Sequence, residues 1–89
     1  ITACNPRSEP TTAAVNAAAN ARLLEALLAA SLRVLTAQGV DPQGVWPAEP
    51  GYLAVGIDAG AVRTLAVRHR QNAIVRMPAG RAAELILMR

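Results

Sequence analysis

The chain has 89 residues, the length of one small domain. Hydrophobic residues make up 53% of it and aromatic residues only 2%, so its core must be built from Leu, Val, Ile and Ala. The formal charge is +3 and all 9 basic residues are arginine, and the absence of lysine excludes Schiff-base catalysis and the lysine of a phosphate-binding loop.

The first predicted element is a short strand over residues 1–4. Asn5-Pro6 ends this strand, because proline has no amide hydrogen and restricts the residue before it. Residues 7–10 are predicted to be a loop. A helix follows over residues 12–31, a segment rich in Ala and Leu, with Thr11 or Thr12 as its N-cap.

One face of this helix combines apolar and amide side chains. Leu24, Leu27 and Leu28 follow the three-four spacing of a buried stripe. Extended towards the start of the helix, the stripe passes through Asn20 and Asn16. Two asparagines are therefore predicted on the inward face, at positions where leucine would be expected.

The next segments are predicted to be a strand over residues 32–37 and a loop over residues 38–50, which is rich in Gly and Pro. The loop carries Trp46 and Glu49. A strand over residues 52–57 alternates between two faces. The residues predicted to face the helices are Leu53, Val55 and Ile57, and those predicted to face away are Tyr52, Ala54 and Gly56.

Asp58 is the predicted N-cap of a second helix, over residues 59–70. Gln71-Asn72 ends this helix. Two further strands are predicted over residues 73–77 and 83–88, with a turn between them.

This order of elements predicts an α+β fold. The first six elements match the ferredoxin-like split βαβ arrangement, β-α-β-β-α-β. Four strands would form one mainly antiparallel sheet with both helices on one face, and the C-terminal strand would extend an edge. Residues 1–89 would form a single domain. Because the chain starts at Ile1 and not at Met, we expect some chain to precede it.

The ferredoxin-like topology brings polar residues from separate segments to one edge of the sheet. His69 arrives at the same edge, and Glu49 and His69 are the candidate catalytic residues. The candidate ligand-binding residues are Asn5, Arg7, Ser8, Asn16, Asn20, Trp46, Glu49, Gln71 and Asn72.

Four short motifs occur along the chain in a specific order and spacing: Thr2-Ala3-x-Asn5-Pro6-x-Ser8, Asn16-x-x-x-Asn20, Trp46-x-x-Glu49 and Gln71-Asn72-Ala73. Together they resemble a small uncharacterised bacterial family, a domain of unknown function. This resemblance implies no activity, substrate or cofactor. It does imply that the motif residues are the signature of the family.

Several chemistries are not expected from these residues. One His and one Cys cannot make a usual zinc site, so no metal is predicted. No glycine-rich dinucleotide fingerprint is present, and no cofactor is predicted. A triad of a serine with His69 and Asp58 is rejected, because Asp58 lies at the opposite end of the second helix. The arginines are spread along the chain, so nucleic-acid binding is not expected.

Three interpretations of the polar edge remain open. In the first, the amides recognise a small polar or anionic ligand, with Arg7, Ser8 and the start of the first helix favouring negative charge. In the second, the protein is a small hydrolase or transferase with Glu49 as general base and Asn5 or Asn72 as oxyanion donor. In the third, the polar residues are a purely structural network.

Assembly and location complete the predictions. The outward face of the strand at residues 52–57 and the apolar last strand predict a homodimer. The single Cys4 forms no internal disulfide, which predicts a reducing, cytoplasmic location. The apolar run at residues 26–32 is too short to span a bilayer, so no membrane association is expected.

Overall fold

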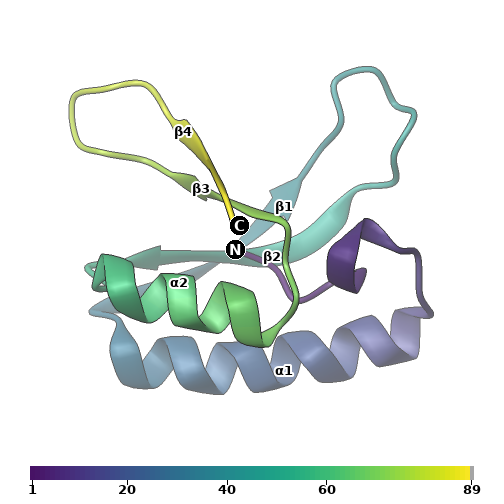
Figure 1. Cartoon of the computed structure of the whole chain (residues 1–89), viewed down its shortest axis with the longest axis horizontal. Coiled ribbons are helices and arrows are strands. Elements are labelled where there is room, and N and C mark those ends of the chain that lie inside the picture. Colours follow the sequence, from purple (N-terminus) through teal and green to yellow (C-terminus); the bar gives the residue numbers. More distant parts are fainter. Residues whose placement is uncertain (89) are drawn as a thin grey trace.

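The computed structural model describes residues 1–88 and has the predicted α+β composition over that range (Figure 1). Its helical and extended segments follow the predicted order from residue 12 onwards. They are a 3-10 turn at Pro6–Ser8, helix α1 at Ala13–Ala30, strands β1 at Arg33–Gly39 and β2 at Glu49–Val55, helix α2 at Ala59–Arg68, and strands β3 at Ala73–Arg76 and β4 at Glu84–Leu87.

Both helices begin at the predicted caps. The hydroxyl of Thr12 accepts a hydrogen bond from the amide of Val15 at 3.2 Å, which satisfies one free donor at the start of α1. The carboxylate of Asp58 accepts from the amide of Ala61 at 3.1 Å at the start of α2. The predicted N-caps are therefore confirmed.

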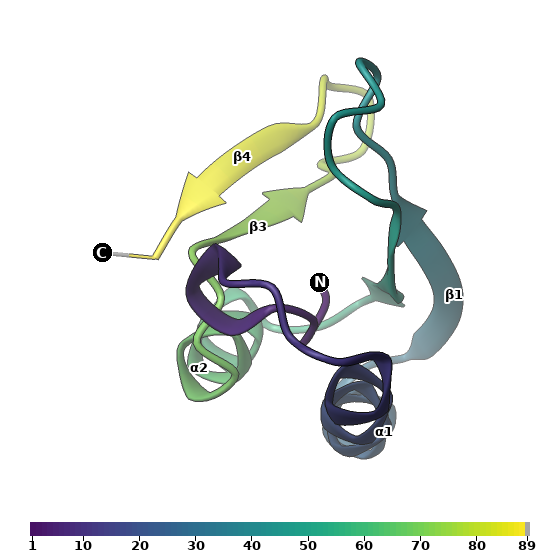
Figure 2. The ribbon, with the colours of Figure 1, turned by 90° about the vertical axis from the view of Figure 1, so that its right-hand side faces the viewer.

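The strands form two separate antiparallel sheets in the described part of the chain. β1 pairs with β2 from Arg33↔Val55 to Gly39↔Glu49, and β3 pairs with β4 from Ala73↔Leu87 to Arg76↔Glu84. Figure 2 shows the two sheets on different sides of the N-terminus. The single four-stranded sheet of the ferredoxin-like prediction is not confirmed, and residues 1–4 do not form the predicted strand.

A proline and an asparagine explain why residues 1–4 do not continue as a strand. Ile1 exchanges two backbone hydrogen bonds with Tyr52 of β2, at 2.9 and 2.8 Å. The next antiparallel partner would be Pro50, which has no amide hydrogen to donate. The side chain of Asn20 bridges this position instead: its Oδ1 accepts from the amide of Ala3 at 2.8 Å and its Nδ2 donates to the carbonyl of Pro50 at 3.0 Å. A side-chain amide thus replaces the missing backbone pair.

The core lies between α1, α2 and the inner face of β1–β2. Its buried members are Ala3, Ala19, Leu23, Leu27 and Leu65. The stripe predicted on α1 is partly wrong, because Leu28 is 60% exposed. The helix is rotated so that the positions of Asn16, Asn20, Leu23 and Leu27 face inwards, the orientation that the bonds of Asn20 require.

The facing predicted for β2 is also wrong. Tyr52 and Ala54 pack against the core, whereas Val55 is 43% exposed. Ile57 does contact the core, but it follows the turn at Gly56, whose φ is +70°. The facing of Ile57 therefore does not follow the alternation of β2. A prediction that counts back from Ile57 assigns the residues of β2 to the wrong faces, because a shift of one residue exchanges the two faces.

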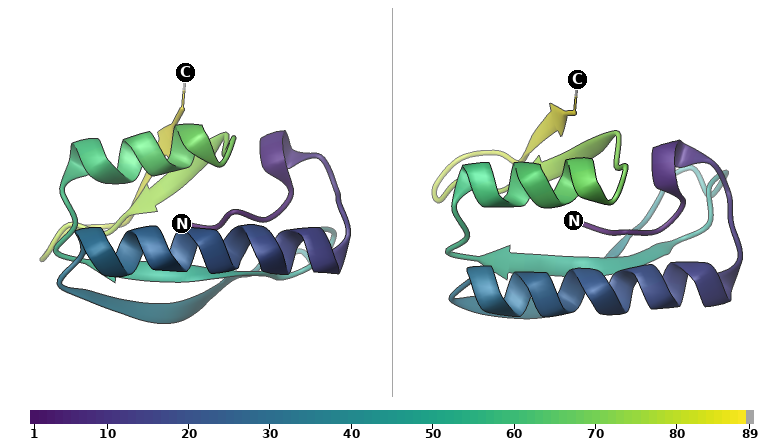
Figure 3. Two further views of the ribbon diagram at one scale, coloured as in Figure 1. Left: turned by 90° about the horizontal axis from the view of Figure 1, so that it is seen from below. Right: turned by 60° about the horizontal axis from the view of Figure 1, so that its bottom comes forward.

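The two helices run antiparallel beside each other (Figure 3). The start of α1, the end of α2 and the turn Pro6–Ser8 consequently lie at one end of the molecule. The residues proposed from the sequence as a site are concentrated at this end.

Candidate functional site

A strained turn forms one wall of the site. Asn5, Arg7 and Ser8 have φ values of 45°, 56° and 61°, in the left-handed region. Asparagine adopts this region readily, but arginine and serine do so at a cost. The turn is held by a backbone bond from Arg7 to the carbonyl of Arg70 at 2.6 Å and by a bond from Asn72 to the hydroxyl of Ser8 at 2.8 Å. Backbone strain kept in place by such contacts is common at functional sites.

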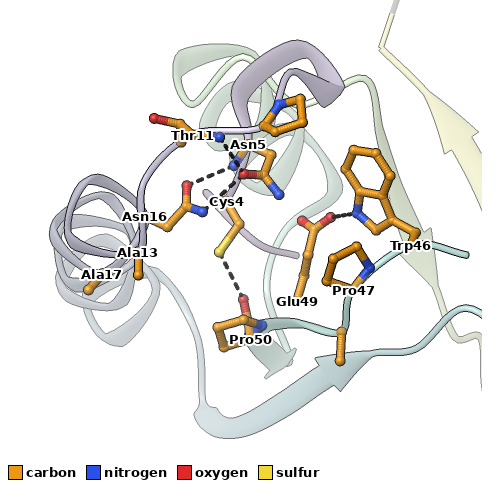
Figure 4. A pocket seen from close by; sticks show the side chains of 12 residues that line it. Cys4, Asn5, Thr11, Ala13, Asn16, Ala17, Trp46, Pro47, Glu49 and Pro50 are labelled. Atoms are coloured by element: carbon orange, nitrogen blue, oxygen red, sulfur yellow. Dashed lines mark hydrogen bonds between the residues drawn. The ribbon is translucent and has the colours of Figure 1, made fainter. Parts of the chain in front are cut away.

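Asn5 and Asn16 are joined by two hydrogen bonds. The backbone amide of Asn5 donates to Oδ1 of Asn16 at 2.9 Å, and Nδ2 of Asn16 donates to Oδ1 of Asn5 at 3.0 Å (Figure 4). Oδ1 of Asn5 also accepts from the amide of Thr11 at 3.1 Å. A backbone N–H can only donate, so these contacts fix both side-chain amides. Within residues 1–88, Nδ2 of Asn5 is left without a hydrogen-bond acceptor.

Trp46 is held on the opposite wall by two carboxylates. Its indole Nε1 donates to Oε2 of Glu49 at 2.6 Å, and its backbone amide donates to Oδ2 of Asp41 at 2.9 Å. Oε1 of Glu49 has no hydrogen-bond donor in the described part of the chain. One carboxylate oxygen of Glu49, Oε2, thus positions the indole, and the other, Oε1, is free to accept a hydrogen bond.

Asp41 is a residue that the sequence interpretation missed. Its carboxylate accepts from the amides of Gln43 and Val45, each at 3.0 Å, as well as from Trp46. The bond from Gln43, followed by that from Trp46, lowers the pKa of Asp41 below its ordinary value. The available signal was Asp41-Pro42-x-Gly44, because an aspartate at the start of such a turn commonly binds the amides that follow it.

Gln71 connects the end of α2 with residue 4. Its Nε2 donates to the carbonyls of Cys4 at 3.1 Å and His69 at 3.2 Å. A carbonyl can only accept, so the nitrogen of this side chain is assigned by its partners and Oε1 is the remaining atom. No donor to that oxygen is present in residues 1–88.

Two adjoining cavities, each of about 390 Å³, lie between these walls. They share Cys4, Asn5, Trp46 and Glu49. The amide of Asn5 and the carboxylate of Glu49 point into the space between α1 and the Trp46 loop (Figure 4). The first cavity is also lined by Pro10, Thr11, Ala13, Asn16, Ala17, Pro47, Ala48 and Pro50, and the second by Ser8, Gln71, Asn72 and Ala73.

The structure brings most of the predicted ligand-binding residues to these cavities, with exceptions. Asn20 lines neither cavity; it is 5% exposed and its amide is used within the fold. Arg7 is exposed and also lines neither cavity. The candidate catalyst His69 is not a lining residue either. Burial, and then the charges of Arg22 and Arg68, lower the pKa of His69 below its ordinary value.

Cys4 is buried at the base of both cavities and its thiol is free. The sulfur accepts from Nδ2 of Asn20 at 3.2 Å and lies 3.5 Å from the carbonyl of Pro50. Glu49 and Cys4 are the titratable side chains among the lining residues, and the cysteine is engaged in the fold.

Residues 1–88 contain no group of three or more His, Cys, Asp and Glu side chains placed to hold a metal ion. Neither helix in that range is long and apolar enough to cross a membrane.

Comparison with protein-family models identifies the family of this chain. A family model described as a protein of unknown function, DUF3293, matches residues 1–74. The chain belongs to the DUF3293 family. The matched region contains all residues that line the two cavities of this DUF3293 protein, and it ends within β3. Searches of curated proteins and of solved structures found no match.

Proposed function

We propose that this DUF3293 protein is a small binding module whose cavities recognise a small polar ligand. The observation that carries the proposal is that three residues lining one cavity each keep a polar side-chain atom without a partner among residues 1–88: Nδ2 of Asn5, Oε1 of Glu49 and Oε1 of Gln71. Ligand sites are typically apolar pockets with a few polar groups. Trp46, Cys4 and Ala73 supply the apolar part of this cavity.

The charge of the lining residues disfavours an anionic ligand. Glu49 contributes a carboxylate to both cavities, whereas Arg7 contributes to neither. A bound anion would meet the negative charge of Glu49 without an arginine to offset it. The anionic ligand considered from the sequence is therefore less well supported than a neutral polar one.

The two alternative interpretations have weaker support. A hydrolase with Glu49 as general base needs a second proton-transfer group, and His69 does not line the cavities. A structural network describes Asn16 and Asn20 well, because both amide atoms of each are bonded within the fold. It does not explain the free atoms of Asn5, Glu49 and Gln71.

The test uses Trp46, which is the only tryptophan in the chain. Its emission reports on the cavities without a label. The protein is titrated with three panels: neutral polar metabolites, phosphate and carboxylate anions, and amines. We expect saturable emission changes with the neutral panel, and we expect the same compounds to raise the melting temperature.

Two variants complete this test. Substitution of Glu49 by Ala should abolish the response, whereas Glu84→Gln, on the distant β3–β4 hairpin, should preserve it. If no panel gives a saturable change, the binding proposal is wrong. Compounds that bind normally to Glu49→Gln, but are converted only by the unmodified protein, would support the hydrolase instead.

We also propose a homodimer, formed through the outer face of the β3–β4 sheet. The register places Val75, Leu85 and Leu87 on one face, where they are 51%, 69% and 44% exposed. Tyr52 and Ala54, the other surface considered from the sequence, pack inwards and do not support it. Light scattering should give a dimer mass that falls to the monomer mass in Leu85→Glu but not in Ala82→Glu. A monomer mass for the unmodified chain at all concentrations would exclude this interface.

Two finer predictions remain proposals. A ferredoxin-like order is supported by the bonds between Ile1 and Tyr52, because that order makes the first and third strands antiparallel neighbours. A reducing, cytoplasmic setting is supported by the single free thiol of Cys4.

A further inference from the structure

The free polar atoms of the cavity define a pattern of hydrogen-bonding groups. Asn5 presents an N–H donor, and Glu49 and Gln71 each present an oxygen acceptor. The contacts of Asn5 with the amide of Thr11, and of Gln71 with the carbonyls of Cys4 and His69, fix which atom of each amide is free. Backbone contacts therefore set the donor of Asn5 and the acceptor of Gln71, and the bond from the Trp46 indole leaves one oxygen of Glu49 as the second acceptor.

A complementary ligand must supply one acceptor and one or two N–H donors. A carbonyl and an N–H side by side, as in a lactam, a urea or a primary amide, have this arrangement. Such a group is uncharged at neutral pH, so it is not repelled by the carboxylate of Glu49, which no arginine of the lining offsets. A site with unpaired polar atoms rejects analogues that cannot pair with them.

Trp46 adds a requirement on shape. Its ring lines both cavities and is held by the bonds of its indole to Glu49 and of its backbone to Asp41. A flat ligand can stack on an indole ring, and the carboxylate that fixes the ring also carries the free acceptor. The pair Trp46–Glu49 would therefore provide both the ring for stacking and one acceptor for the N–H of the ligand.

We infer that the cavity recognises a planar, uncharged molecule with a carbonyl and an N–H on the same edge. The carbonyl accepts from Nδ2 of Asn5, the N–H groups donate to Oε1 of Glu49 and of Gln71, and the ring lies against Trp46. This inference rests on the proposed binding function and specifies the ligand class for the same site.

The test compares uracil with 1,3-dimethyluracil. Both are neutral planar rings with the same two carbonyls, but the dimethyl compound has no N–H. On the unmodified protein, we expect uracil to bind at least about tenfold more tightly, as measured by Trp46 emission and ligand-observed NMR. Glu49→Gln places a donor where the free acceptor was, and should remove at least about tenfold of uracil affinity. Glu84→Gln is the matched control and should leave the affinity unchanged.

The outcomes separate this inference from the proposed function. Equal binding of the two rings, or binding of neither while other polar compounds still change the Trp46 emission, overturns the ligand class and leaves the binding module in place. No binding by any compound overturns both. If Glu49→Gln fails to fold, the comparison of the two rings on the unmodified chain still decides the question.

Discussion

The side-chain amide of Asn20 donates a hydrogen bond to the carbonyl oxygen of Pro50 over 3.0 Å. The same amide accepts from the backbone of Ala3 at 2.8 Å, so it joins the N-terminal segment to β2 where proline interrupts the backbone pairing. Asn20 is 5% exposed and Ala3 is 1% exposed, so the amide of Ala3 has no water as an alternative partner once the side chain is removed, whereas the carbonyl of Pro50 keeps the hydroxyl of Thr2 at 2.7 Å.

Substitution of Asn20 by Leu tests this role directly. If the position were an ordinary core position, leucine would stabilise the fold by burying more apolar surface. We expect the reverse, a loss of about 2 kcal/mol in the free energy of unfolding, because the amide of Ala3 is left buried without a partner. Urea unfolding measures the change. Ala21→Gln, on the exposed face of α1, is the control and should change stability by less than about 0.5 kcal/mol. A Leu variant as stable as the parent would refute the bridging role.

Gly51 provides a second test of the N-terminal contact. A Cβ atom at this position would lie 2.6 Å from the carbonyl oxygen of Ile1 and 3.1 Å from Cβ of Thr2. We expect Gly51→Ala to displace residues 1–2 and to cost about 1–3 kcal/mol. Hydrogen exchange should show loss of protection at the amide of Tyr52, which donates to Ile1.

Gly39 is the matched control for this substitution, since it lies on the paired strand and a Cβ there would come no closer than 3.9 Å to the carbonyl of Glu49. Gly39→Ala should change stability by less than about 1 kcal/mol. Retained protection at Tyr52 in Gly51→Ala would show that the N-terminal segment adapts without detaching.

Asp41 is expected to control the mobility of Trp46 more than the stability of the fold. Its carboxylate fixes the amide of Trp46, but the loop lies on the surface. Asp41→Ala should therefore increase quenching of Trp46 by acrylamide with little change in the urea midpoint. Asp58→Ala should do the opposite, lowering stability by about 1 kcal/mol through loss of the α2 cap, with unchanged quenching of the folded protein. Equal quenching in the parent and Asp41→Ala would mean that Glu49 alone holds the indole.

His69 predicts a pH dependence of stability. Burial, Arg22 and Arg68 lower its pKa in the folded state below the ordinary value of 6.5. The unfolded chain therefore binds a proton more readily, and stability should fall as the pH drops below about 6.5 and through the lowered pKa of His69. Urea unfolding between about pH 8 and pH 5 measures this slope. In His69→Gln the slope over this range should be reduced, and an unchanged slope would assign the dependence to another group.

Local chemistry accounts for the parts of the fold that the sequence predicted. Thr12 and Asp58 cap the helices as expected, because a cap depends on residues within one turn. The facing of β2 was not predictable from alternation, since Ile57 reaches the core from beyond the turn at Gly56. The failure of residues 1–4 to form a strand depends on the meeting of Asn20 with Pro50, which no periodicity reveals.

The candidate site was also only partly predictable from the sequence. The predicted order of elements places the ends that carry Asn5, Glu49 and Gln71 together, and these residues line one cavity, although the single sheet of that prediction is not confirmed. The order of elements could not distinguish the amides used within the fold from those left free. That distinction depends on single tertiary contacts, such as the amide of Thr11 against Asn5.

The walls of the cavity come from opposite ends of the chain, which has a consequence for folding. The bond from Gln71 to Cys4 spans 67 residues and that from Asn72 to Ser8 spans 64, whereas the two strand pairs and both helices are local. Contacts between distant residues carry a larger loop-closure entropy and form late. The cavity therefore forms only after the hairpins and helices exist, and a partly folded chain has no complete cavity. The binding proposed above would then require the completely folded chain, and a bound ligand would oppose the separation of these two segments during unfolding.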